Sequence, residues 1–407
     1  MKQGDGQGLV EPIVNRYRRR KKKGSAFWLS LAGIVFLFVL VVVLRLWMLT
    51  GFPWVRVSIV ERDDNLVCLR GAMGLLAPEQ EAESWLKAGI DEAFQAKLEF
   101  LGILTSSPDT LRPQAADAPL AVLVGQQVVH EAGQAAFYGL DSTLGQKDWD
   151  SPSVFRVVRH LKGWGLLDPG AYPENEGRQW QGREPDAVQL LPAAQAPSLG
   201  FGDTLMASLG GLFDARAKWL HLARRPTAQL VSWDTIARTR HTLGLCGQII
   251  DDAGAWSELA GQPLTHLLVR KGFGPYDKRE VYEALRAGHH FCALPSLGDA
   301  TAFRFRLVSK ASGEELAMMG DSLVLPKEGG AELLVDVGLA KTPVGLRVHL
   351  LADGEEVAAG VENKMKVSIE RGGAYRVEVG IMGGDFPWGE SEHMWIYSNP
   401  IRIGEKH

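Results

Sequence analysis

The chain has 407 residues, enough for two domains, and its 46% hydrophobic and 23% charged residues are ordinary for a globular protein. Residues 1–25 carry eight basic and two acidic side chains, a net charge of +6, whereas the whole chain carries -4. The remaining residues therefore carry -10, which argues against nucleic acid as a partner of the folded part.

The segment that follows this basic tail is apolar. Residues 26–44 include no charged side chain and are long enough to cross the ~30 Å core of a bilayer as a helix. The positive-inside rule then leaves residues 1–25 in the cytoplasm. The sequence predicts a single-pass protein of the bacterial inner membrane, with an anchor over 26–50 in contact with lipid and a periplasmic or extracellular main domain. A cleaved signal peptide is the alternative, but no small-residue cleavage site follows the apolar run.

The next part of the chain, 55–300, alternates short apolar strands with helices. This order predicts an α/β fold with a mostly parallel sheet, either open or closed into a barrel. The expected strands are 54–60, 65–69, 121–124, 187–191, 243–246 and 265–270. The expected helices are 79–101, 153–162, 204–224, 232–242 and 277–287. The strand 243–246 ends on Gly247 and a polar turn, and such strand ends carry the active-site residues of α/β barrels.

The last part, 301–407, contains alternating apolar and polar residues without a helical pattern. It predicts a small β-sandwich or antiparallel sheet. The expected strands are 303–307, 331–337, 346–351, 364–369, 374–380 and 394–397, and hairpin turns are expected at 352–354 and 372–373.

The three cysteines lie in apolar runs and are odd in number, so they do not indicate a disulfide framework. We expect Cys68, Cys246 and Cys292 to be buried free thiols. One disulfide among the three remains an open alternative.

Two late segments carry a family resemblance. Tyr276–Leu294 (YDKREVYEALRAGHHFCAL) and the Tyr-Ser-Asn-Pro-Ile sequence of 397–401 resemble the CehA/McbA-type branch of the PHP (polymerase and histidinol phosphatase) superfamily. The resemblance covers about 55–403. It implies a distorted β/α barrel over 55–300, followed by a β-sandwich over 301–407. It also implies two or three metal ions, held by His, Asp and Glu at the strand ends, that activate water to hydrolyse phosphoesters.

The same resemblance indicates where the metal ligands would lie, and nearly all of them are missing. In chain order these positions are Gly74, Leu76, 105–107, Gln127, Gln134, Asp168, Gln189, Ile249 and Asp251. The strings H-x-H, T-D-H and S-D-x-H occur nowhere in the chain. Glutamine in place of Glu or His keeps a polar group of similar size without its charge, as expected where the balancing cations have been lost. The sequence therefore predicts a pseudoenzyme without a cofactor.

The former active-site cleft remains the expected ligand surface, since barrel strand ends form a concave, polar-rimmed pocket. Gln127, Gln134, Asp168, Gln189 and Asp251 would border it. The expected role is a binding or envelope-assembly module, with an envelope protein or a saccharide as partner. The alternative is a divergent metal-dependent phosphoesterase with a rebuilt site, in which a divalent ion lies near Asp168 and Asp251.

Overall fold

The computed structural model describes residues 27–44, 54–55, 57–62, 65–78, 81–130, 133–145, 153–167, 185–190, 219, 223–246, 261–271, 278–325, 330–369, 371–385 and 389–404. It contains two compact units, Met1–Phe52 and Pro53–His407. In the first unit, Phe27–Leu44 form one helix that is long and apolar enough to be a membrane anchor or a signal sequence. Its orientation across a membrane stays a prediction.

The second unit contains a 15-stranded mixed sheet, which confirms the α/β class. Within it the neighbouring strands β1, β2 and β3 are parallel, and β5, β6 and β7 form a second parallel group on the other side of the antiparallel strand β4. The first half of the unit contains, in chain order, β1 (Leu66–Leu76), α2 (Ala82–Gln95), β2 (Phe100–Thr105), α3 (Pro108–Ala116), β3 (Ala121–His130), β4 (Gly133–Tyr138), α5 (Val154–His160), β5 (Trp164–Leu167), β6 (Ala187–Gln189), α7 (Thr227–Thr239), β7 (Leu243–Leu245), β8 (Leu264–Arg270), α8 (Lys278–Ala287) and β9 (His290–Ala293).

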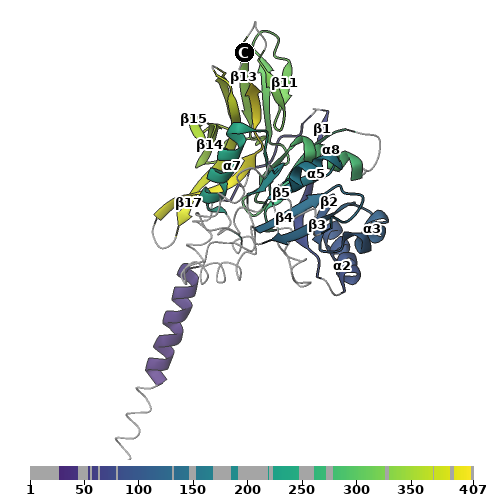
Figure 1. Cartoon of the computed structure of the whole chain (residues 1–407). Helices are drawn as coiled ribbons and strands as arrows, with labels where there is room; N and C mark the ends of the chain where they lie inside the picture. Colours follow the sequence, from purple (N-terminus) through teal and green to yellow (C-terminus); the bar gives the residue numbers. More distant parts are fainter. Residues whose placement is uncertain are drawn as a thin grey trace, which may run out of the picture. The chain divides into compact units, whose positions relative to one another are not determined.

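Helices α2 and α3 lie beside β2 and β3 (Figure 1). Buried side chains of α2 recur at helical spacing, for example Leu86 and Ala93, and they pack in one cluster with Leu101 and Ile103 of β2. The helix ends at Gln95, and Lys97 adopts a left-handed conformation with φ 57°. The expectation of one helix over 79–101 is therefore wrong at its C-terminal end, because the chain reverses at Lys97 and the apolar residues after it form a strand.

Other boundaries also differ from the expectation. Strand β1 continues to Leu76, well past residue 69, whereas the described residues of 54–60 contribute only an isolated bridge between Ile59 and Leu339. The expected parallel arrangement fails for β4 and β8, which run antiparallel to their neighbours. Most of the helix expected over 204–224 lies outside the described residues.

The second half of the unit is built from strands. A four-stranded sheet has the order β11-β10-β13-β16, and the other strands belong to the large sheet. The bounds are β10 (Arg304–Ser309), β11 (Glu315–Met318), β12 (Ser322–Val324), β13 (Ala331–Asp336), β14 (Leu346–Ala352), β15 (Glu355–Gly360), β16 (Lys364–Ser368), β17 (Gly373–Asp385), β18 (Gly389–Ser398) and β19 (Ile401–Gly404).

Both sheets contribute to one buried cluster, for example Leu333 from β13 and Val348 from β14. The turn expected at 352–354 does join the hairpin β14–β15. The turn expected at 372–373 does not make a hairpin, because β16 pairs with β13 and β17 pairs with β14, β18 and β19. Strand β18 also pairs with β9, so the large sheet runs from one half of the unit into the other.

Strands β7 and β9 lie next to each other without a backbone ladder between them. Asn399 joins them: its Oδ1 accepts the N–H of Gly244 at 2.6 Å and its Nδ2 donates to the carbonyl of His290 at 3.0 Å. Cys246 and Cys292 form a disulfide there, with Cα atoms 5.4 Å apart. The expectation of free thiols is therefore wrong for this pair, because the fold brings the ends of β7 and β9 together. Cys68 is free.

Candidate functional site

The parallel strands end at one edge of the sheet, where the resemblance places the ligand cleft. Leu76 pairs with Leu104, Gln127 with Ala136, and Gln189 with Leu245. Cross-strand partners point to the same face of a sheet. The partner residues Leu104, Ala136 and Leu245 belong to one buried cluster, and we call its side of the sheet the inner face. Leu76, Gln127 and Gln189 therefore lie on the inner face near this edge.

Tyr138 of β4 fills the inner face below these residues. Its side chain is buried, and its hydroxyl accepts the backbone N–H of Gly74 at 3.2 Å. A Cβ atom at Gly125 would lie 2.7 Å from the Tyr138 ring, and one at Gly102 would lie 2.3 Å from the sulfur of Met73. The glycines thus make room for a tightly packed aromatic and apolar filling. Burial raises the pKa of the Tyr138 hydroxyl above its usual range, so the phenol is neutral.

Gly74 occupies the first position at which the resemblance would place a metal-binding histidine. It has φ +79°, in the left-handed region, and the register between β1 and β2 shifts between Met73 and Leu75. This bulge turns Leu75 into the outer cluster under α2 and returns Leu76 to the inner face. Any residue other than glycine would be strained in this conformation, so Gly74 is the residue that allows the strand to bend here.

Of residues 105–107, Thr105 points away from the cleft. It pairs with Gln126, on the face opposite Gln127. The hydroxyl of Thr105 accepts the N–H of Ser107 at 3.2 Å, just before α3 begins, and Ser106 and Ser107 are exposed. The amide of buried Gln126 binds both backbone groups of Leu144, at 2.7 and 3.1 Å. Thr105 and Gln126 thus hold loops in place, and Gln127 lies on the inner face.

Gln189 and Gln262 have buried amide atoms without partners in the described part of the chain. Gln189 is 5% exposed and its Nε2 has no hydrogen-bond acceptor; Gln262 is 4% exposed and its Oε1 has no donor. Gln262 lies two residues before β8, whose Thr265 pairs with Gly71 of β1, so it is at the same edge of the sheet. No motif marks Gln262 in the sequence, since it is an isolated glutamine before an apolar strand.

The remaining expected site residues are not brought into the cleft by the described structure. Gln134 pairs with Val129 in the β3–β4 hairpin, and its side chain is not described. Asp168, Ile249 and Asp251 lie outside the described residues. Within the described ranges there is no group of three or more His, Cys, Asp or Glu residues that could hold a metal ion. The ion site near Asp168 and Asp251 stays a prediction.

Two buried histidines lie close to the junction of β7, β8 and β9. His266 donates from Nδ1 to the carbonyl of Leu264 at 3.3 Å and stacks on Phe291 at 4.9 Å. His290 Nε2 lies 3.2 Å from the carbonyl oxygen of Gly244. Burial lowers the pKa of His266 to about 4 and that of His290 to about 3. Both imidazoles are therefore neutral at pH 7, and their hydrogen bonds connect backbone segments.

No protein-family model and no curated protein matches the chain. A search of solved structures finds the crystal structure of a two-domain protein containing a predicted PHP-like metal-dependent phosphoesterase from Bacteroides vulgatus ATCC 8482. That protein is 11% identical, the match covers 83% of this chain and 99% of the other, and the TM-score is 0.41. At this level of similarity the likeness carries no argument. Membership of the PHP superfamily stays a prediction based on the sequence resemblance.

Proposed function

We propose that the chain is a membrane-anchored extracytoplasmic protein with a PHP-like distorted barrel and a β-sandwich. In this proposal it is a pseudoenzyme that acts as a binding or envelope-assembly module. The observation that carries the proposal is the filling of the inner face. Tyr138 packs against Gly125 and against Gly74, one of the positions at which the resemblance implies a metal ligand. The barrel itself is supported by Asn399, which bonds β7 to β9 and so brings distant strands of the sheet together.

The chemistry of the cleft also favours binding over hydrolysis. Zinc, manganese and iron sites use imidazole, thiolate and carboxylate ligands, and the charge of these ligands compensates that of the cation. The described inner face offers the amides of Gln127 and Gln189 instead, which are neutral. Changes even outside the direct ligands typically reduce metal affinity or activity ~10–100-fold. Replacement of ligands themselves is expected to reduce them further.

A neutral polar ligand such as a saccharide fits these amides better than an ion. Among the described residues, the buried Nε2 of Gln189 has no acceptor and the buried Oε1 of Gln262 has no donor. An unsatisfied buried polar group costs about 1–3 kcal/mol. A sugar hydroxyl can donate and accept, so it would satisfy either group without adding charge.

The proposed location is supported by three features. The helix Phe27–Leu44 is apolar enough to span a membrane, and the Cys246–Cys292 disulfide suits an oxidising compartment outside the cytoplasm. The basic residues before the helix favour a cytoplasmic N-terminus. A bacterial inner-membrane protein with a periplasmic or extracellular main domain meets all three conditions.

A hydrolysis assay tests the proposed function. The full-length protein in a neutral detergent is incubated with mono- and bis-(p-nitrophenyl) phosphate in the presence of Mg²⁺, Mn²⁺ or Zn²⁺. The matched control is the quadruple variant Gln127→Ala/Asp168→Asn/Gln189→Ala/Asp251→Asn, prepared in parallel. We expect no difference between the two proteins, because any residual rate would come from contaminants. Hydrolysis that the quadruple variant loses would overturn the proposal in favour of the divergent phosphoesterase.

A further inference from the structure

A groove lies at the edge of the sheet opposite to the candidate cleft. Its volume is about 640 Å³, and its lining comes from α8, β11, the start of β1 and the end of β8. Leu66 begins β1, and Arg270 ends the antiparallel strand β8, which pairs with it. The groove therefore borders the amino ends of the parallel strands, whereas Gln127 and Gln189 lie near their carboxyl ends. Its volume is in the range of ~300–1,000 Å³ that is typical of ligand sites.

The edge of strand β11 borders this groove. Its four residues, Glu315–Met318, all contribute to the lining. Side chains alternate between the two faces of a strand, so consecutive lining residues indicate that the strand edge faces the groove. Within the described part of the chain β11 pairs only with β10. Such an edge is a template for one more strand.

Glu315 is the residue whose backbone is open at this edge. Ser309 of β10 donates its N–H to the carbonyl of Glu314, so Glu315, which pairs with Val308, directs its backbone groups away from β10, and Leu316 lies in the bulge that follows. The backbone groups of Met318 also point away from β10, but they are already bound: its N–H donates to the Asp321 carboxylate at 2.9 Å, and its carbonyl accepts the Asp321 N–H at 3.0 Å. An added strand would therefore exchange its backbone hydrogen bonds with Glu315.

Strand β8 offers a second short edge on the other side of the groove. Its pairing with β9 ends at Leu267, and Leu268 donates its N–H to His289. Val269 and Arg270 continue beyond that point and pair with β1 on their other side. Both residues line the groove. A segment in the groove would thus have strand edges on both sides.

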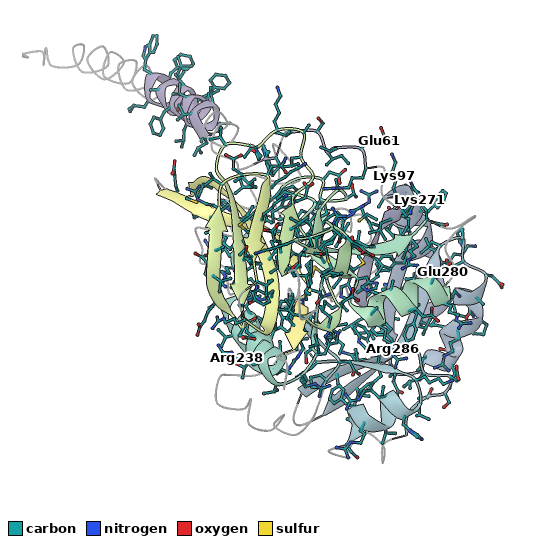
Figure 2. The ribbon with its side chains drawn as sticks, turned by 90° about the horizontal axis from the view of Figure 1, so that it is seen from above. Glu61, Lys97, Arg238, Lys271, Glu280 and Arg286 are labelled. Carbon is teal, nitrogen blue, oxygen red and sulfur yellow. A yellow bond between two sulfur atoms is a disulfide. The ribbon has the colours of Figure 1, made fainter. Side chains whose placement is uncertain are left out.

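The groove is lined by more acidic than basic side chains, which favours a basic ligand. Glu280, Glu283, Glu315 and Asp321 line it, against Arg270 and His289. Figure 2 shows Glu280 on α8, and its side chain is exposed. Asp321 binds His289 at 2.9 Å within the lining. Glu283 and Glu315 bind arginines outside the lining: Glu283 binds Arg279 at 2.8 Å and Glu315 binds Arg306 at 3.3 Å. Such exposed pairs contribute little to stability, so an incoming cation can replace the arginine.

The groove also has an apolar component. Leu66, Leu268, Leu316, Ala284 and Ala287 contribute to its lining. An extended peptide presents alternate side chains to opposite sides. A segment that alternates basic and apolar residues would place its apolar side chains on these residues and its basic side chains on the carboxylates.

We propose that this groove binds a short, extended, basic segment of a partner protein, which adds as a strand to the edge of β11. The inference deepens the proposed role as a binding module and rests on it. It assigns that role a surface separate from the candidate cleft. The partner is identified by its chemistry: an extended backbone with alternating basic and apolar side chains.

Fluorescence anisotropy with defined peptides tests the proposal on the full-length protein in neutral detergent. The probe is a labelled peptide of alternating valine and lysine. Its two controls are the same peptide with glutamate in place of lysine, and with N-methylated backbone amides on the bonding side. We expect the lysine peptide to bind, and both controls to bind at least about tenfold more weakly, since one loses the charge pairs and the other the strand hydrogen bonds.

Variants locate the binding. Glu280→Gln/Glu283→Gln is expected to weaken the lysine peptide about tenfold, as two partly exposed charge pairs are lost. The matched control Glu355→Gln/Glu362→Gln removes the same charge on and after β15 and leaves the affinity unchanged. Equal binding of all three peptides, no binding of the lysine peptide, or undiminished affinity of the Glu280→Gln/Glu283→Gln variant would overturn the groove proposal. Hydrolysis that the quadruple variant of the cleft loses would instead overturn the proposed function, so the two failures are distinguishable.

Discussion

The side chain of Asn399 accepts a hydrogen bond from the backbone N–H of Gly244 at 2.6 Å, which joins the C-terminal segment to β7. The same side chain donates to His290 of β9 at 3.0 Å. Asn399 belongs to the Ser-Asn-Pro-Ile sequence that carries part of the family resemblance. Its physical role is to satisfy two buried backbone groups where β7 and β9 lie side by side without a ladder.

Asn399→Ala is therefore expected to destabilise the protein by about 2–6 kcal/mol, since each of the two buried groups left unpaired costs about 1–3 kcal/mol. Denaturant unfolding of the full-length protein, followed by tryptophan fluorescence, measures this free energy. Ser398→Ala is the control: Ser398 binds one backbone group, the N–H of Val377 at 2.8 Å, so we expect about half the effect. A loss below 0.5 kcal/mol (roughly the scatter of surface substitutions) for Asn399→Ala would contradict this role.

Acid should destabilise the protein through its buried histidines. Burial holds the pKa of His266 at about 4 and that of His290 at about 3. Because the unfolded state takes up protons first, near pH 6.5, the stability is full above that pH and falls as the pH drops toward 4 and 3. At pH 5 each histidine accounts for a loss of about 2 kcal/mol relative to pH 7.

Urea unfolding of the wild type and of His266→Phe at pH 7 and pH 5 tests this prediction. Phenylalanine keeps a ring stacked on Phe291 and cannot titrate. We expect the variant to lose about 2 kcal/mol less than the wild type between the two pH values. An equal loss in both proteins would show that His266 does not contribute to the acid sensitivity.

Thiol counting tests the cysteine arrangement. The Cys246–Cys292 disulfide leaves Cys68 as the free thiol, and burial raises the pKa of Cys68 to about 12. A thiol with so high a pKa is nearly all protonated at pH 8, so it reacts slowly with maleimide in the folded protein. We expect no adduct in the native state, one after unfolding, and three after unfolding and reduction. Three adducts without reduction would disprove the disulfide.

An ion-pair chain joins α7 to β17. Arg376 binds both carboxylate oxygens of Asp234 at 2.8 Å and also Glu378, and Arg225 binds Glu378 at 2.7 and 2.9 Å. Arg376 is 2% exposed and its guanidinium lies 5.2 Å from the ring centre of Trp233.

Arg376→Met leaves buried carboxylates without this partner, so we expect the free energy of unfolding to fall by about 3–5 kcal/mol. Arg279→Met, which removes the exposed pair with Glu283, should cost less than about 1 kcal/mol. Equal losses would contradict the importance of burial.

The sequence predicted the elements whose signals are local. The strands at 121–124, 187–191, 243–246 and 265–270 all occur, and the helix at 277–287 ends before Gly288, whose φ of +79° suits glycine. Predictions failed where tertiary contacts decide. The reversal at Lys97 has no glycine to mark it, and the disulfide depends on β7 and β9 being neighbours although their cysteines are 46 residues apart.

The candidate site was likewise predicted only in part. Gln127 and Gln189 were predicted as cleft residues, and the structure places both on the inner face near one edge of the sheet. Tyr138 was not predicted, because its importance comes from glycines on neighbouring strands that leave room for its ring. The groove beside β11 was not predicted either, since an open strand edge becomes visible only when the pairing of the strands is known.

Metal stoichiometry tests the pseudoenzyme proposal most directly. The full-length protein is incubated with Mn²⁺, Fe²⁺ or Zn²⁺, dialysed against metal-free buffer in neutral detergent, and analysed by inductively coupled plasma mass spectrometry. The variant Gln127→Ala/Asp168→Asn/Gln189→Ala/Asp251→Asn, which removes the candidate ligands of the rival metal site as well, controls for adventitious binding elsewhere on the surface. We expect the wild type to retain no more metal than this variant. One or more equivalents retained by the wild type and lost by the variant would show a working metal centre and contradict the proposal.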